Sequence, residues 1–257
     1  MFGDDVQLDM SVTWGVGLAL AVARSAALVG LCGFVPRSIP KMGRTALAVA
    51  LGLLIAQPIG TPQISAADLA TAAFTNVTLG AILGWFLGLA ASMFQVAGTT
   101  IDLSSGISLG SVFDPDSGNT PGPFAHFYTL AAQTLIIAGG GLLAITQILW
   151  YSTKVVALDG HLGRLSMLGD VATSRVDAMF RHGVELALPV AAVLFVSELA
   201  FGLLSRLAPQ INMFLIALPM KSLMALSMMG TACVLFPRFA NQAVDMGLET
   251  TRRLLGG

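Results

Sequence analysis

The sequence predicts an all-α integral membrane protein, built as a single membrane domain over residues 1–257. Of these residues 55% are hydrophobic and only 11% are charged, whereas soluble domains carry about 25% charged residues. Because so few charges cannot shield this much apolar surface from water, we expect lipid or apolar partner subunits to surround the chain. The apolar stretches show no strand-type alternation, which favours helices over a transmembrane barrel.

About six hydrophobic helical segments, arranged as hairpins, are expected at 11–35, 45–60, 69–97, 124–151, 183–208 and 211–236. A bilayer span needs about 20 apolar residues. The second stretch reaches that length only if Lys41 and Arg44 extend to the membrane interface. Between the last two stretches a proline limits helix continuation, which predicts a tight hairpin turn at Pro209, Gln210 and Asn212.

The stretch 98–123 differs from its neighbours because it is rich in glycine and proline and has no lysine or arginine. It is too apolar for a solvated linker, and its glycines and prolines argue against a continuous helix. We therefore expect a re-entrant, plug-like loop shielded by protein or lining a water-filled cavity. A plain structural turn is the alternative, since Asp-Pro and Ser-Gly favour turns.

The segment 161–182 is amphipathic, with arginines between apolar residues at helical spacing, and predicts a helix on the membrane surface. Basic residues gather in 37–44, in 152–182 and near the C-terminus, but are absent from the N-terminus and from 57–68. Basic loops favour the cytoplasm, so we expect an outside N-terminus and an inside C-terminus. This orientation fits the loop charges only if the third stretch does not cross the membrane but returns to the side from which it came. The net charge of −1 does not suggest nucleic acid.

Small residues recur at four-residue steps at Gly80, Gly84 and Gly88. This spacing lets helix backbones approach closely, either within this chain or against other subunits. The two cysteines, Cys32 and Cys233, are interpreted as small hydrophobic residues, with a disulfide as the less favoured alternative.

Four charges are candidates for burial, because a charge at the bilayer centre costs about 3 kcal/mol and therefore faces partners or water: Arg24, Glu198, Arg206 and Lys221. Glu198 can pair with any of the other three, and the sequence does not choose. The alternative to an ion pair is that Glu198 takes part in a proton relay. Nothing indicates an enzyme, a cofactor or a metal, since the histidines lack ligand spacing and no catalytic motif is present.

Two segments carry patterns more specific than composition. The first runs from Trp85-Phe86-Leu87-Gly88 to Val112-Phe113-Asp114-Pro115-Asp116-Ser117-Gly118, and the second from Leu199 through Arg206-Leu207-Ala208-Pro209-Gln210-Ile211-Asn212. In order and spacing they resemble the signature regions of the FliR/SctT family of export-apparatus proteins, over most of the chain. The Phe113–Gly118 segment favours the flagellar branch, with the injectisome branch as the alternative.

The resemblance implies a subunit of the protein-export gate, assembled with FliP-like and FliQ-like membrane subunits and working with FlhB-like and FlhA-like components on unfolded exported proteins. It places the chain in the bacterial inner membrane, within the flagellar basal body, where the charge pattern predicts a periplasmic N-terminus and a cytoplasmic C-terminus. It also implies that the plug loop contains Gly106, Gly110, Val112, Phe113, Asp114, Pro115 and Gly118. An independent proton-coupled transporter and a non-conducting membrane scaffold are the rival hypotheses.

Overall fold

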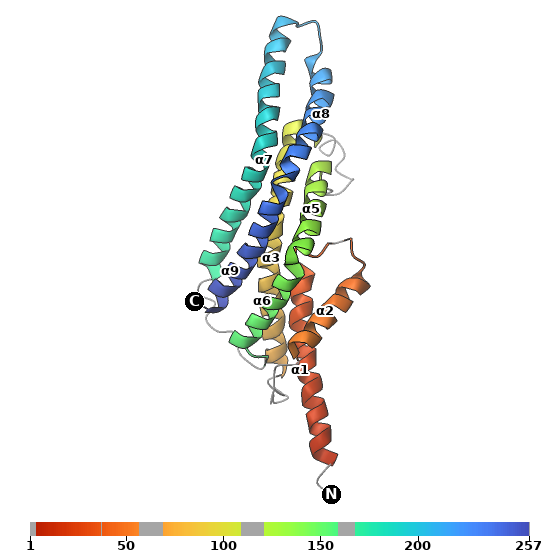
Figure 1. Cartoon of the computed structure of the whole chain (residues 1–257), viewed down its shortest axis with the longest axis vertical. Helices are drawn as coiled ribbons and strands as arrows, with labels where there is room; N and C mark the ends of the chain where they lie inside the picture. The colour runs from red at the N-terminus through yellow and green to blue at the C-terminus, as the bar shows by residue number, and fades with distance from the viewer. Residues whose placement is uncertain (1–3, 37, 57–68, 109–120, 159–167, 257) are drawn as a thin grey trace. The chain divides into compact units, whose positions relative to one another are not determined.

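Every regular element that the structure describes is a helix, which confirms the predicted all-α class (Figure 1). The computed structural model describes residues 4–36, 38–56, 69–108, 121–158 and 168–256. The elements are α1 (Asp4–Leu31), α2 (Lys41–Ala56), α3 (Leu69–Ser105), α5 (Pro123–Ile136), the π-helical turn η2 (Ile137–Gly141), α6 (Leu142–Val155), α7 (Leu168–Leu207), α8 (Met213–Cys233) and α9 (Phe236–Gly256).

Five described segments are long and apolar enough to cross a membrane: Trp14–Leu31, Leu69–Ser105, Pro123–Val155, Leu168–Leu207 and Met213–Cys233. The expected segment 45–60 overlaps α2, which has 16 residues, at 45–56, and its residues 57–60 lie outside the described part of the chain. At 1.5 Å per residue a helix of that length spans about 24 Å, less than the roughly 30 Å of a hydrocarbon core. The described residues therefore support five candidate spans and not six.

Two predicted boundaries were wrong. The expected loop 98–123 begins later, because α3 continues as a helix through Ser105 and ends at Gly106, whose φ is 80°. A glycine at that position ends helices readily because it adopts the left-handed conformation without strain. Likewise, the predicted surface helix 161–182 and the span 183–208 are not separate, since α7 is continuous from Leu168 to Leu207.

Helix α9 was not predicted. The sequence analysis predicts no helix after residue 236, yet α9 is amphipathic and buries Phe236, Phe239, Ala240, Ala243 and Met246. That spacing of three, four and seven residues is a helical signal that the sequence already contained. Pro237 lies in the first turn of α9, where its missing N–H costs nothing.

The chain divides into two compact units. The first comprises residues 1–90, 137–175 and 243–257. Within it α1 packs on α2, where the Ser25 hydroxyl donates to the Ala48 carbonyl at 2.7 Å. On its other side α1 meets α3 at the predicted small-residue positions. A Cβ built on Gly84 would lie 2.5 Å from the Leu28 carbonyl oxygen, and one on Gly88 would lie 2.9 Å from that of Leu31.

The second unit comprises residues 91–136 and 176–242. Its core contains an aromatic cluster in which Phe236 lies edge-on to Phe94 at 5.8 Å and to Tyr128 at 4.8 Å, measured between ring centroids. Such T-shaped pairs are favourable because the positive edge of one ring meets the negative face of another. Helices α7 and α8 form a hairpin in this unit (Figure 1).

The two cysteines are free thiols, Cys32 buried and Cys233 exposed. This agrees with their interpretation as small hydrophobic residues and not with a disulfide. Burial raises the pKa of the Cys32 thiol to about 11, so that at neutral pH it remains protonated and unreactive.

The close approach of α3 to α1 gives a first prediction. Gly84→Ala should destabilise the protein by about 1–3 kcal/mol, because the added methyl group meets the α1 backbone, which cannot rotate away. Gly15→Ala is the matched control, since a Cβ there meets nothing within 4 Å, and replacing an exposed helical glycine by alanine is neutral or stabilising. The measurement is the thermal unfolding midpoint in detergent. Equal midpoints for the two variants would contradict the packing.

Candidate functional site

A buried carboxylate, that of Asp102, lies at the base of the glycine- and proline-rich segment. Asp102 is on the last turns of α3 and is only 2% exposed. Its Oδ1 accepts the backbone N–H of Phe124 at 3.1 Å, and its Oδ2 accepts that of Ala125 at 2.8 Å. These are two of the N–H groups at the start of α5 that no helical carbonyl can satisfy. Asp102 therefore caps a helix that begins 21 residues later.

Glycines let the backbone come close enough for this contact. A Cβ on Gly122 would overlap the Asp102 carboxylate, and one on Gly98 would lie 2.7 Å from the Ala125 nitrogen. Pro123 opens α5 in a conformation that suits a first helical turn. At the other end, the Ser108 N–H approaches the Asp102 backbone carbonyl at 3.5 Å. Both ends of the segment 106–122 therefore lie beside Asp102. We call this shared anchoring point the closed base of the segment.

The predicted plug residues divide between described and undescribed positions. Gly106 is the residue of positive φ that ends α3. Gly110, Val112, Phe113, Asp114, Pro115 and Gly118 lie outside the described residues. What the structure adds is the anchoring at Asp102, a residue of the signature region to which the sequence analysis gave no role.

Arg24 is completely buried in the first unit, with 0% exposure. Its Nε donates to Asn76 Oδ1 at 2.8 Å, its Nη1 to Ser152 Oγ at 3.3 Å, and its Nη2 to the Val156 carbonyl at 3.0 Å. All three are neutral acceptors. A buried guanidinium is tolerated when its donors are satisfied in this way.

Asn76 extends the Arg24 contact. Its amide donates to the Leu158 carbonyl at 2.8 Å and to the Ala72 carbonyl at 2.7 Å. Arg24 and Asn76 thus fix α1, α3 and the end of α6 to one another. The sequence signal for this network is an asparagine four residues before Gly80 in a predominantly apolar helix, and the sequence analysis gave it no role.

Glu198 pairs with Lys221, and its Oε1 lies 3.1 Å from Lys221 Nζ across the α7–α8 hairpin. The structure thus chooses among the three partners that the sequence had left open. The Lys221 side chain is 12% exposed and that of Glu198 is 64% exposed. Arg206 is exposed in the last turn of α7, where a cation offsets the negative end of the helix dipole.

The hairpin turn lies at 208–212, and α8 starts directly after Asn212. The Ala208 N–H donates to the Leu204 carbonyl at 2.9 Å, and the Ile211 N–H to the Ala208 carbonyl at 3.1 Å. Pro209 and Gln210 are exposed in this turn. Pro209 has no N–H to leave unsatisfied there.

The α7–α8 hairpin presents large apolar side chains that no other described part of the chain covers. Only 6% of the apolar window of α8 is buried, against 56% for that of α3. The exposed members include Phe195, Leu199, Leu203 and Leu207 on α7 and Phe214, Leu215, Leu223 and Leu226 on α8. A contiguous apolar surface of this kind requires lipid or a protein partner.

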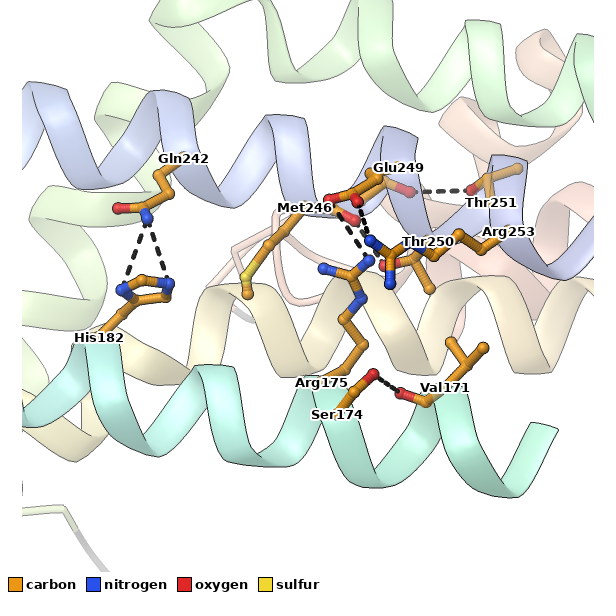
Figure 2. Close-up of polar contacts among 11 residues, drawn as sticks. Val171, Ser174, Arg175, His182, Gln242, Met246, Glu249, Thr250, Thr251 and Arg253 are labelled. Atoms are coloured by element: carbon orange, nitrogen blue, oxygen red, sulfur yellow. Dashed lines mark hydrogen bonds and ion pairs between the residues drawn. The ribbon is translucent and has the colours of Figure 1, made fainter. Parts of the chain in front are cut away.

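Polar contacts between α7 and α9 occur in both units (Figure 2). In the first unit, Arg175 from α7 lies 3.4 Å from Glu249 of α9, and Arg253 also donates to Glu249 (Figure 2). Partial burial raises the pKa of the Glu249 carboxyl, but the positive charges of Arg175 and Arg253 outweigh it and hold the pKa below its ordinary value. In the second unit, Gln242 of α9 and His182 of α7 are 3.1 Å apart.

Sequence comparisons match the chain to known bacterial proteins over most of its length. The family described as bacterial export proteins, family 1, matches residues 16–247. The flagellar biosynthetic protein FliR of Bacillus subtilis (strain 168) is 27% identical over 244 residues, covering 93% of each chain. FliR of Escherichia coli (strain K12) is 27% identical over 211 residues, or 79% of this chain and 78% of that protein.

The surface presentation of antigens protein SpaR of Shigella flexneri is 32% identical over 154 residues, or 60% of this chain and 59% of that protein. The apolar helices and these matches define an inner-membrane component of a bacterial protein-export apparatus. The chain belongs to the FliR/SctT family of type III secretion proteins.

The Asp102 cap gives a second prediction. Asp102→Asn should destabilise the protein by about 1–3 kcal/mol, because one carboxylate oxygen is replaced by an NH₂ group that faces an N–H donor. Hydrogen exchange followed by mass spectrometry should show faster exchange at 122–128. Asp177→Asn is the control, because that carboxylate is 66% exposed in a surface pair with Arg181 and should change little. Unchanged exchange in Asp102→Asn would contradict the cap.

The Glu249 cluster gives a third prediction, on pH. A carboxyl whose folded-state pKa is lowered contributes stability above its unfolded pKa, and this contribution is lost as the pH falls through the folded-state pKa. The wild-type protein should therefore lose thermal stability more steeply than Glu249→Gln below the ordinary pKa of 4.5. Since Glu249 is 51% exposed, the difference should stay below about 1 kcal/mol. Parallel curves for the two proteins would contradict the pairing.

Proposed function

We propose that this chain is a non-enzymatic subunit of the protein-export gate in the flagellar type III secretion apparatus, and that its segment 106–122 forms part of the plug that closes the pore. The observation that carries the proposal is the closed base at Asp102, which anchors both ends of an apolar, glycine-rich segment. A plug has to block ions while closed and move without unfolding its frame. An anchored base with a glycine-rich interior meets both requirements.

The bare α7–α8 hairpin supports an obligately assembled subunit. Its apolar side chains suit contact with other membrane helices, and FliP-like and FliQ-like subunits are the partners that we propose. FlhB-like and FlhA-like components would act beside them on unfolded exported proteins. Gly80, Gly84 and Gly88 serve packing inside this chain, so the hairpin is the better candidate for contact between subunits.

The flagellar branch is favoured by coverage, because FliR of Bacillus subtilis aligns over 93% of both chains. The Phe113–Gly118 segment points in the same direction. The equivalent subunit of an injectisome is the second candidate, favoured by the higher identity of 32% to SpaR over a shorter alignment.

The charges of the connecting segments support a periplasmic N-terminus and a cytoplasmic C-terminus. A proton-coupled transporter is less well supported. Glu198 is 64% exposed and paired with Lys221, whereas a relay needs enclosed, successive titratable groups.

A fourth prediction tests the plug. Replacing residues 109–120 by a short Gly-Ser linker retains Asp102 and Gly122, so the base should still close and the complex should still assemble with its partners. Ion conductance of the purified complex in planar bilayers should rise. The control is Gly169→Ala, at an exposed helical position outside the hairpin surface and with no atom within 4 Å of the added methyl group. Unchanged conductance in a fully assembled deletion complex would count against a plug.

Native mass spectrometry of the co-purified complex tests the assembly. We expect this chain only in complex with partner subunits. A stable, conducting monomer would instead favour the transporter hypothesis.

A further inference from the structure

A cleft between α1 and α2 in the first unit has no role in export as proposed above. Its volume is about 450 Å³, within the range of small-molecule sites. Its lining includes Val22, Ala26 and Val29 of α1 and Lys41, Arg44 and Thr45 of α2. The lining is apolar apart from one threonine and two cations, and none of its residues is acidic.

The two cations lie at one end of the cleft. Arg44 Nη2 donates to the Val29 carbonyl at 3.1 Å and to the Gly30 carbonyl at 3.2 Å, at the C-terminal end of α1. The apolar window of α1 runs from Trp14 to Leu31, so these carbonyls mark one end of a candidate membrane span. Lys41 is exposed at the start of α2. The cleft therefore carries its positive charge at the level expected for lipid headgroups.

The apolar end of the cleft extends along the span. Val22, Ala26 and Val29 follow α1 at intervals of four and three residues, and so lie on one face of that helix. The cleft ends where the helices touch, because a Cβ on Gly52 would lie 2.8 Å from the Val22 Cα. The shape is a short apolar trough parallel to a membrane span, closed at its inner end and positively charged at its outer end.

We propose that this cleft binds an anionic phospholipid of the surrounding bilayer. Its phosphate contacts Lys41 and Arg44, and the first part of an acyl chain lies on Val22, Ala26 and Val29. Basic pockets between membrane helices bind acidic lipid headgroups, and each lysine or arginine near the membrane surface contributes about fivefold in affinity. A zwitterionic lipid lacks the net negative charge that these two cations favour, since no acidic residue lines the cleft.

The test uses the full chain, alone and in complex with its partners, in nanodiscs that contain equal amounts of phosphatidylglycerol and phosphatidylcholine. Native mass spectrometry of the released protein should show phosphatidylglycerol retained in preference to phosphatidylcholine. Lys41→Gln should reduce that retention about fivefold. Arg206→Gln, which removes an exposed cation at the end of α7, should leave it unchanged.

A second variant addresses the apolar part of the cleft. Ala26→Phe places a ring at an exposed position of the trough and should displace the acyl chain with both cations in place. Equal retention of the two lipids, or retention unaffected by both Lys41→Gln and Ala26→Phe, would overturn the proposal. So would full displacement by inorganic phosphate, which would indicate a soluble anion, or loss of the lipid in the assembled complex, which would indicate a subunit contact.

Discussion

One buried carboxylate fixes the geometry on which the proposed gate depends. Asp102 accepts the first free N–H groups of α5 and so determines where that helix starts relative to the end of α3. Uncapped N–H groups in an apolar environment are costly because neither water nor lipid satisfies them there. Gly98 and Gly122 leave room for this contact, because a side chain at either position would collide with it. The segment that follows α3 therefore starts and ends beside the same carboxylate.

The cost of leaving a buried polar group unsatisfied also explains the contacts of Arg24. In a chain with 11% charged residues, a buried cation has few carboxylates to pair with, and this one is solvated by an amide, a hydroxyl and backbone carbonyls. Those acceptors come from two separate parts of the chain, α3 and the end of α6, so the cost of burying the charge is offset only when the helices are correctly assembled. A polar network of this kind favours one helix arrangement over others.

Two exposed regions of the chain differ in their balance of charged and apolar side chains. Glu198 and Lys221 form the ion pair of the α7–α8 hairpin amid exposed leucine and phenylalanine side chains. The charged contacts on α9 instead join it to α7 along an amphipathic helix. The first surface suits a membrane or a membrane partner, and the second suits an interface with water on one side.

The sequence by itself determined the helical membrane class, since local hydrophobicity and the lengths of apolar stretches are properties of consecutive residues. It also located most helices and the turn near Pro209. The sequence did not determine that residues 98–105 stay helical. Gly98 lowers the helix propensity of this stretch, but its close packing against Ala125 compensates for that loss. Nor could it choose Lys221 for Glu198, or join Asp102 to Phe124 and Arg24 to Ser152. Those choices depend on which helix faces meet, and only the tertiary structure brings together residues such as Arg24 and Ser152, which are 128 positions apart.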